Sequence, residues 1–312
     1  MPTLEAHIAE YDEYWKEREL EAIKNLDKAY HPNPEDVVRH YNDHFSRTML
    51  EFNSTEKVLE ESKKGPCQVT NPVDRCWRCD SDWEKNRKKL VNCAPGFARG
   101  TTGGKGGEFY VVTDPIDNAA DRKPGTLRHA VTQTGPLWIT FKGSMTIKLE
   151  QELIVTSNKT IDVRGTNMEI RNAAGITVQF AKNVIIHGLH IHQIIPAKGG
   201  KIKDGEKHLG LRSASDVDGI SLFGATNIWL DHLSLHHCAN GLIDVLQGST
   251  VVTISNCHIT NQNYVMFGAS DSYSADEKMQ VIVALNHFGK GLEERMPRCR
   301  FGFIHVVNNG YN

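Results

Sequence analysis

Short apolar runs that recur through the second half of the chain constrain the fold most. Small polar pairs follow closely after each of five such runs: Val184-Ile185-Ile186, Ile228-Trp229-Leu230, Val251-Val252-Thr253-Ile254, Val281-Ile282-Val283 and Phe303-Ile304-His305-Val306-Val307. From Asp231 to Asn256 is 25 residues, and the next two intervals, ending at Asn286 and Asn308, are 30 and 22. Repetition of short strands at such spacing is typical of a solenoid. We therefore predict an all-β fold, a right-handed parallel β-helix with three short strands per coil and asparagines aligned at its bends.

An antiparallel sandwich is the alternative fold. It would show tight hairpin turns between adjacent runs, and Asn240-Gly241 and Asn309-Gly310 are turn signals of that kind. The spacing of the runs favours the solenoid, but the residues alone leave both folds open.

A helical segment is expected before the solenoid. Residues 4–30 carry apolar side chains near one helical face among many Glu and Lys, and residues 34–51 follow a proline that suits a helix start. Residues 53–65 are polar and are expected to form a linker. We divide the chain into a helical N-terminal extension with its linker, 1–65, and a β-helix domain, 66–312.

Composition excludes several classes of protein. The 312 residues are 39% hydrophobic and carry a formal charge of -2, which indicates a soluble globular protein and argues against a nucleic-acid binder. No run approaches a membrane span. No signal peptide follows Met1, so the protein is intracellular or the chain begins after processing. Asn53 and Asn158 lie in glycosylation sequons, which are weak evidence for secretion.

Acidic and amide residues cluster between residues 216 and 244. Asp216, Asp218, Asn240 and Asp244 offer only oxygen atoms as ligands. Calcium prefers oxygen ligands, whereas zinc prefers His or Cys. If adjacent coils bring these residues together, they form a calcium site. The alternative is that the Asp-Gly pairs only turn the chain.

Arginines cluster near the end of the chain. Arg295, Arg298 and Arg300 lie within six residues. Such a run is often a solvated basic edge, but on a strand Arg298 and Arg300 share one face. Because a guanidinium binds carboxylates bidentately, a cation site beside these arginines indicates a polyanionic ligand that carries carboxylates.

Several longer motifs resemble those of one family. They are Asn71-Pro72-Val73-Asp74-Arg75-Cys76-Trp77-Arg78-Cys79, Gly103-Gly104-Lys105-Gly106-Gly107, Pro124-Gly125-Thr126-Leu127-Arg128, Trp229-Leu230-Asp231-His232 and Arg295-Met296-Pro297-Arg298-Cys299-Arg300. Together they resemble plant pectate lyases of polysaccharide lyase family 1 over residues 70–312. The leading segment resembles the N-terminal extension of pollen-type members.

The resemblance implies a reaction and a site. The family binds polygalacturonate on a parallel β-helix and cleaves it by calcium-dependent β-elimination, which leaves 4,5-unsaturated ends. Asp216 and Asp244 are then expected to ligate calcium, with Asp218 in the same site. Asn240 stands where the family usually has Asp or Glu, and its neutral oxygen is expected to ligate calcium more weakly.

The arginines acquire roles by the same resemblance. Arg295 is expected to take the C5 proton of the substrate. Arg300 is expected to bind a substrate carboxylate, with Arg298 also in the substrate site. A free guanidinium is protonated at neutral pH, so an arginine base implies an alkaline optimum.

Other departures from the family pattern keep alternatives open. Tyr264 replaces a lysine, and Val163 replaces a glycine, where a positive φ would strain valine. The β-helix domain is expected to be truncated at its C-terminal end, near Asn309. A weak or inactive homologue that binds pectate is therefore one alternative, and a lyase acting on methylated pectin is another.

The family also implies an extracellular setting. We expect a monomer secreted to the cell wall, with disulfides Cys76–Cys93 and Cys238–Cys257. Three of the seven cysteines, Cys67, Cys79 and Cys299, have no expected partner. A redox site at Cys76-x-x-Cys79 is a remote alternative.

Overall fold

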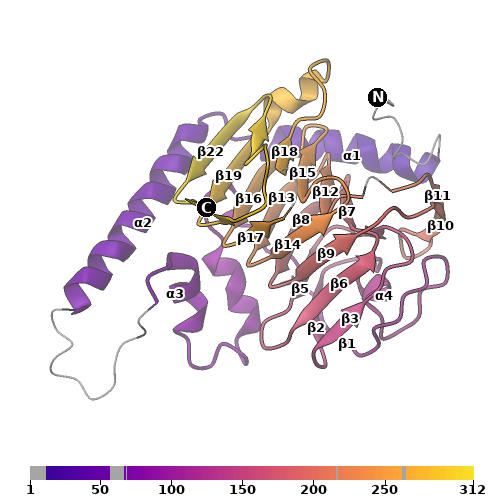
Figure 1. The fold of residues 1–312 in the computed structure, drawn as a ribbon, viewed down its shortest axis with the longest axis horizontal. Coiled ribbons are helices and arrows are strands. Elements are labelled where there is room, and N and C mark those ends of the chain that lie inside the picture. Colours follow the sequence, from indigo (N-terminus) through magenta and orange to yellow (C-terminus); the bar gives the residue numbers. More distant parts are fainter. Residues whose placement is uncertain (1–11, 57–66, 68, 216, 262–264) are drawn as a thin grey trace.

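The computed structural model describes residues 12–56, 67, 69–215, 217–261 and 265–312, and side chains of 51–56 are not considered. Within this part, three parallel sheets form the walls of a right-handed β-helix, as predicted (Figure 1). The chain visits the sheets in turn, so each coil adds one short strand to each wall. The all-parallel register excludes the antiparallel sandwich.

In each sheet, strands that are neighbours in space come from successive coils, in the following order. The eight-stranded sheet contains β1 (Glu108–Val112), β2 (Leu137–Phe141), β5 (Lys159–Asp162), β8 (Lys182–His187), β13 (Thr226–Asp231), β16 (Thr250–Ser255), β19 (Gln280–Ala284) and β22 (Phe303–Val307). The six-stranded sheet contains β21 (Arg298–Cys299), β18 (Val265–Phe267), β15 (Ile243–Leu246), β12 (Ile220–Phe223), β7 (Ile176–Gln179) and β4 (Leu153–Ile154). The seven-stranded sheet contains β23 (Gly310–Tyr311), β20 (His287–Phe288), β17 (His258–Thr260), β14 (Ser234–Cys238), β9 (His190–Ile194), β6 (Met168–Ala173) and β3 (Met145–Ile147).

Smaller elements interrupt or cover the coils. An antiparallel hairpin pairs β10 (Gly200–Lys203) with β11 (Leu209–Arg212). The helices are α1 (Glu13–Ala29), α2 (Pro34–Glu56), α3 (Pro72–Arg78), α4 (Leu127–Val131) and the 3-10 turns η2 (Arg87–Cys93), η3 (Gly96–Ala98) and η4 (Ser274–Lys278). In the described part of the chain, no helix is both long and apolar enough to cross a bilayer.

The apolar runs of the sequence all become strands of the eight-stranded sheet. Their inward side chains meet those of the other two walls in one continuous core. The polar pairs after the runs lie at and around the bend that follows each strand, where Asn256 and Asn308 have positive φ. Asn286 donates to Asn309 on the next coil at 3.0 Å, so asparagines do align at the bends. An amide side chain suits this position because it tolerates the left-handed backbone and bonds its neighbour.

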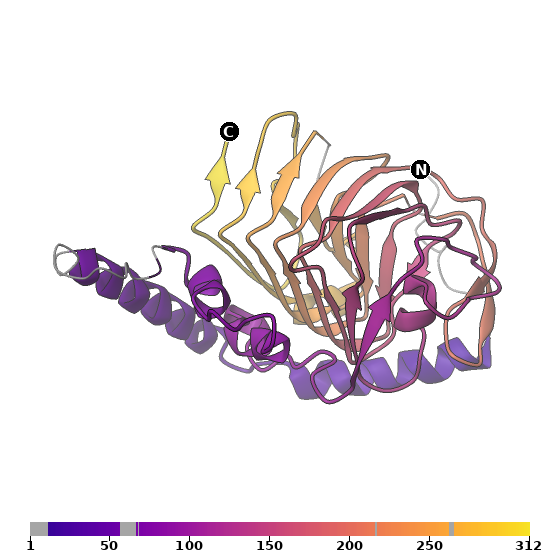
Figure 2. The same ribbon diagram turned by 90° about the horizontal axis from the view of Figure 1, so that it is seen from below.

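The two leading helices lie outside the solenoid. Asp12 caps α1, and the buried Trp15 of α1 donates from Nε1 to Asp204 at 2.9 Å. Figure 2 shows α1 along one side of the coils and α2 extending away from them. Helix α2 continues through Glu56, so the linker predicted from Asn53 begins later; residues 57–66 lie outside the described part.

The cysteines correct one prediction. Cys76–Cys93 is present as expected, and Cys67–Cys79 forms a second bridge, which contradicts a Cys76–Cys79 redox pair. The expected Cys238–Cys257 bridge is wrong: both thiols are free and buried. The backbone N–H of His258 bonds the carbonyl of Leu233, so Cys257 lies beside the start of β14. Cys238 ends that strand, roughly 15 Å further along at about 3.3 Å per residue, too far for a disulfide.

Val163 is also accommodated. It is not one of the residues with a positive φ; Gly165, two positions later, adopts φ 85° instead. The predicted backbone strain at Val163 therefore does not arise.

Candidate functional site

The register of the six-stranded sheet brings two of the predicted site residues, Asp244 and Arg298, into one row. Asp244 on β15 lies opposite Ser221 on β12 and opposite Met266 on β18. Met266 in turn lies opposite Arg298 on β21. Neighbouring strands are about 4.8 Å apart, so this row carries a carboxylate and, two strands away, a guanidinium.

Asp218 lies in the bend before β12 and joins two coils. Its Oδ1 accepts from the Asn240 amide at 2.9 Å and from the Gly241 backbone N–H at 2.6 Å. Its Oδ2 accepts from the Ser221 hydroxyl at 3.0 Å. Asp218 and Asn240 therefore meet on adjacent coils. These three donors are neutral, so the charge of an ionised Asp218 is not cancelled by them.

The backbone beside Asp218 is strained. Val217 has φ 65°, a left-handed conformation that is unfavourable for a β-branched residue. Such strain costs on the order of 1–3 kcal/mol and is often found at functional sites. Asp216, the preceding predicted ligand, lies outside the described residues, and so does Tyr264.

Asp244 completes the oxygen-rich part of the row. It is buried, as is Asp218, and the Ser221 hydroxyl that bonds Asp218 comes from the position opposite Asp244. Burying an ionised carboxylate costs several kcal/mol unless a cation or donors compensate it. With Asn240, the two aspartates form an all-oxygen set of the kind that calcium prefers. The donor chemistry therefore fits a calcium ion.

Arg295 approaches this row from the segment before β21. Its Nη1 lies 3.9 Å from the Met266 sulfur, and its Nε lies 3.2 Å from a Glu294 carboxylate oxygen. Its backbone has φ 57°. The side chain is half-buried, so the guanidinium lies beside the row and stays accessible to solvent.

Arg300 reaches the same methionine from the other side of β21. Its Nη1 lies 4.0 Å from the Met266 sulfur and donates to the Gly268 carbonyl at 2.7 Å. Its Nε donates to Asp271 at 2.7 Å. Both guanidinium groups therefore converge on Met266, and Arg300 is held by two further contacts.

Sequence reasoning did not identify Met266 or the carboxylates that hold the arginines. Met266 lies 22 residues after Asp244, one coil later, and that spacing was the signal that could have found it. Nothing in the sequence singles out Glu294 or Asp271, because acidic residues in loops are common.

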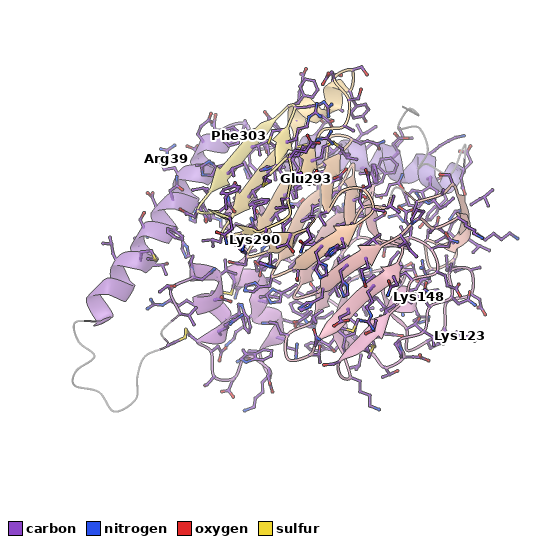
Figure 3. The ribbon with its side chains drawn as sticks, in the orientation of Figure 1. Arg39, Lys123, Lys148, Lys290, Glu293 and Phe303 are labelled. Carbon is purple, nitrogen blue, oxygen red and sulfur yellow. A yellow bond between two sulfur atoms is a disulfide. The ribbon has the colours of Figure 1, made fainter. Side chains whose placement is uncertain are left out.

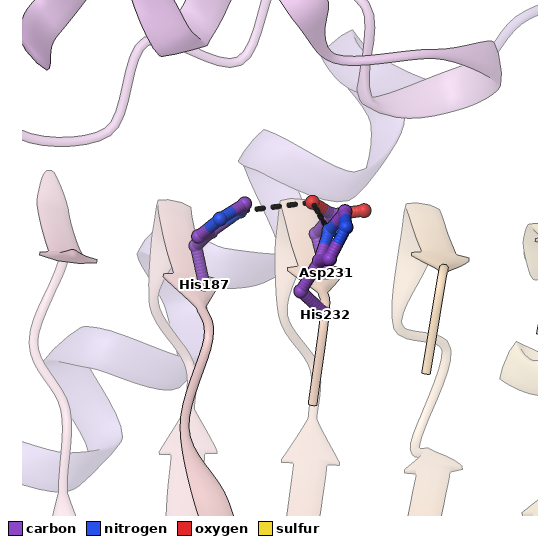
Figure 4. A group of neighbouring side chains, drawn as sticks. All are labelled: His187, Asp231 and His232. Atoms are coloured by element: carbon purple, nitrogen blue, oxygen red, sulfur yellow. Dashed lines mark hydrogen bonds and ion pairs between the residues drawn. The ribbon is translucent and has the colours of Figure 1, made fainter. Parts of the chain in front are cut away.

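A second acidic cluster lies at the edge of the eight-stranded sheet, inside the Trp229-Leu230-Asp231-His232 motif (Figure 4). Asp231 Oδ2 lies 2.8 Å from His187 Nδ1 and 2.6 Å from His232 Nδ1. Its Oδ1 accepts from Ser255 at 2.5 Å and from Asn256 at 2.8 Å. Protein groups thus surround both oxygens of Asp231.

Helix α3 covers this cluster. Asn71 caps the helix by accepting from the backbone N–H groups of Val73 and Asp74. The capped turn places an Asp74 carboxylate oxygen 2.9 Å from His232 Nε2. The cluster therefore fastens α3, and the disulfides attached to it, to the coils.

Opposite charges in this cluster stabilise one another. Burial acts to lower the pKa of His232, but Asp231 and Asp74 outweigh it and raise the pKa to about 10. Burial lowers the pKa of His187. Burial alone would raise the pKa of Asp231, but His232 and His187 hold that pKa below its usual value.

The same three side chains have the composition of a metal site, since their ligand atoms lie within 4.8 Å of one another. A metal would have to displace the His232 proton and the contacts around Asp231. We therefore interpret this cluster as structural and the row from Asp218 to Arg300 as the candidate active site.

Comparisons with known proteins show which family the chain resembles. The family model described as "Pectate lyase" matches residues 85–312, and "Pectate lyase, N terminus" matches residues 7–59. A pectate lyase from Lilium longiflorum is 57% identical and covers 98% of this chain and 71% of its own length. Probable pectate lyase P59 from Solanum lycopersicum is 56% identical, with 100% and 72% covered.

A solved structure is also similar. The crystal structure of Jun a 1, the major allergen from cedar pollen, matches with a TM-score of 0.76 and 45% identity. The match covers 78% of this chain and 71% of the allergen. A pectate lyase structure described with an anti β-elimination mechanism has a TM-score of 0.52 at 18% identity, which supports the fold alone.

Proposed function

This chain belongs to the pectate lyase family, and we propose that it cleaves (1→4)-α-D-galacturonan by calcium-dependent β-elimination. The observation that carries the proposal is the row on the six-stranded sheet, which combines buried aspartates with guanidinium groups. Such a row suits a substrate that bears a carboxylate on every sugar.

Asp218, Asn240 and Asp244, together with Asp216, are the residues that would hold the cation. Bound calcium would act as a Lewis acid toward the uronate carboxylate and make the C5 proton more acidic. The protein's part is to fix the oxygen ligands on adjacent coils. The hydrogen bonds that Asp218 accepts from Gly241 and Ser221 keep it in place without using a charge.

Arg295 is the base in this proposal. Its half-buried guanidinium lies beside the row, within reach of a sugar ring bound over Met266. As Arg295 in its neutral form takes the C5 proton, the C5–H electron pair forms the C4–C5 double bond and the C4–O bond breaks. The leaving oxygen takes a proton from solvent, and Arg295 releases the C5 proton to solvent, so no water is consumed.

Arg300 and Arg298 bind the substrate. Arg300 is anchored by Gly268 and Asp271, and an anchored fork loses little entropy when it binds a carboxylate. Arg298 lies directly across from Met266 in the register, so it would meet the same part of the chain.

The setting of the protein is part of the proposal. Two disulfides favour an oxidising compartment, and the family favours secretion to the cell wall. We retain the division at residue 65, a monomeric state and pectin as the partner as proposals; glycosylation at the sequons stays a prediction. The comparisons lend no support to the non-catalytic alternative.

Absorbance of unsaturated product separates the candidate functions. We expect product from polygalacturonate with calcium, none with chelator, and an optimum in the alkaline range. Arg295→Lys should remove at least about 100-fold of the rate, since a positioned acid–base group contributes about 10²–10⁴. Binding without product would favour the pectate-binding alternative. Chelator-independent product from methylated pectin would favour a lyase that acts on methylated pectin.

A further inference from the structure

Histidines are concentrated on the outer face of the seven-stranded sheet. Six of the 15 histidines in the chain lie there: His190 and His192 on β9, His236 and His237 on β14, His258 on β17 and His287 on β20. This sheet faces the viewer in Figure 3, between the labelled Lys290 and Lys148. Neither the proposed elimination reaction nor the core uses these imidazoles.

Strand alternation explains why they face outward. Ile259 and Phe288 point into the core, so their neighbours His258 and His287 point away from it. The parallel register then places His258 directly opposite His287. Two adjacent coils therefore hold this pair of rings at fixed positions.

The two rings face each other through nitrogen atoms. Their centroids are 4.7 Å apart, and the two Nδ1 atoms are 2.8 Å apart. When both rings are neutral, one Nδ1 can donate its proton to the lone pair on the other Nδ1. On the other side of the His287 ring, Nε2 lies 2.7 Å from the side-chain nitrogen of Asn312.

The separation of the two nitrogens matches a chelate. Imidazole nitrogens bind a divalent metal at about 2.0–2.1 Å, so two of them at a right angle are roughly 2.9 Å apart, and roughly 3.3 Å apart at the tetrahedral angle. The observed 2.8 Å is closer to the right angle. Right-angled nitrogen ligands suit the tetragonal geometry of Cu²⁺ or Ni²⁺, and Cu²⁺ binds most tightly among the divalent first-row metals.

We propose that His258 and His287 form a binding site for a divalent transition metal, with Cu²⁺ preferred. Water completes the coordination, because His258 is exposed and the residue opposite His287 on β23 is Gly310. The site is distinct from the proposed calcium site in both place and chemistry. It lies on another wall of the solenoid, and it offers nitrogen where calcium requires oxygen.

Titration of the intact protein with Cu²⁺, followed by calorimetry and electron paramagnetic resonance, tests the proposal. A site with two nitrogen ligands should appear in the hyperfine pattern, and a large excess of Ca²⁺ should not displace the copper. His258→Gln/His287→Gln should lose one Cu²⁺ equivalent or at least tenfold in its affinity. The single variant His258→Gln should do the same if the double variant is unstable.

His44→Gln is the matched control, because it removes an exposed histidine from α2, away from this face. It should keep the full copper binding. His236→Gln/His237→Gln should keep the equivalent lost in the first variant. If the His258 variants bind copper with wild-type stoichiometry and affinity, or if Ca²⁺ competes, the proposal is wrong.

Discussion

The two aspartate clusters of this protein use the same coil geometry in opposite ways. At the Asp231 cluster the counter-charge is a histidine of the protein itself, His232, and α3 covers it. At the Asp218–Asp244 cluster the donors described around Asp218 are neutral, and the guanidinium groups gather beyond Met266. The ends of stacked strands can therefore hold a carboxylate beside a positive group of the protein, or place carboxylates where they could bind an external cation.

Replacing one aspartate from each cluster gives the largest contrast. Asp231→Asn should lower the free energy of unfolding by about 3–5 kcal/mol, because it removes the buried carboxylate that both His187 and the His232 imidazolium contact. Asp218→Asn should change it by less than about 1 kcal/mol in chelator, because an amide can still accept from Gly241. Denaturant unfolding of the two variants measures the difference. Equal losses would remove the distinction between a structural and a functional cluster.

Catalysis should show the reverse order. Asp244→Asn should reduce product formation at fixed calcium by about 100-fold or more, since it removes a charged ligand next to the proposed reaction centre. Its midpoint of thermal unfolding in chelator should stay within a few degrees of wild type. A variant that lost its activity only because it unfolded would contradict the role of Asp244 as a ligand.

A substitution at Asn240 should strengthen the proposed calcium site rather than remove it. Asn240→Asp should bind calcium about 10- to 100-fold more tightly, or about 1.4–2.8 kcal/mol, because it adds a charge. It also replaces the amide that donates to Asp218 with a like charge, so the variant should be less stable without calcium. Calorimetric titration and thermal unfolding with and without calcium measure both effects. Unchanged affinity would rule out Asn240 as a calcium ligand.

Taken per pH unit, the pH dependence of the Asp231 cluster is the smallest of these effects. The pKa of His232 is raised to about 10, so its contribution to stability is complete below pH about 6.5 and is lost as the pH rises to about 10. The slope from this group is at most about 1.4 kcal/mol per pH unit over that window. The difference between wild type and His232→Gln, measured by denaturant unfolding from pH 6 to 10, should shrink as the pH rises. A constant difference would mean that His232 is neutral in the folded protein.

Periodic features of the sequence predicted the fold well. All five apolar runs became strands of one sheet. Their apolar side chains need a shared core, and the stacked coils provide one. The contact between Asp218 and Asn240 was also predictable, since one coil separates them.

Features that depend on the register were not predictable. Cys238 and Cys257 have suitable spacing along the chain, yet they lie at different ends of β14. Met266 was missed because a thioether carries no chemical signal for a site, although it is the atom group on which Arg295 and Arg300 converge. The proposed copper pair was missed because His258 and His287 are 29 residues apart and only the register brings them together.

Labelling of the free cysteines can report how the solenoid opens. Cys299 is exposed, so a thiol reagent should label it within the folded state. Cys238 and Cys257 lie in successive coils, where burial raises the pKa of Cys238 to about 12 and also raises that of Cys257. Each buried thiol can react only after its own coil separates from the next. The order in which mass spectrometry detects labelled Cys238 and Cys257 will therefore report the direction in which the coils unstack.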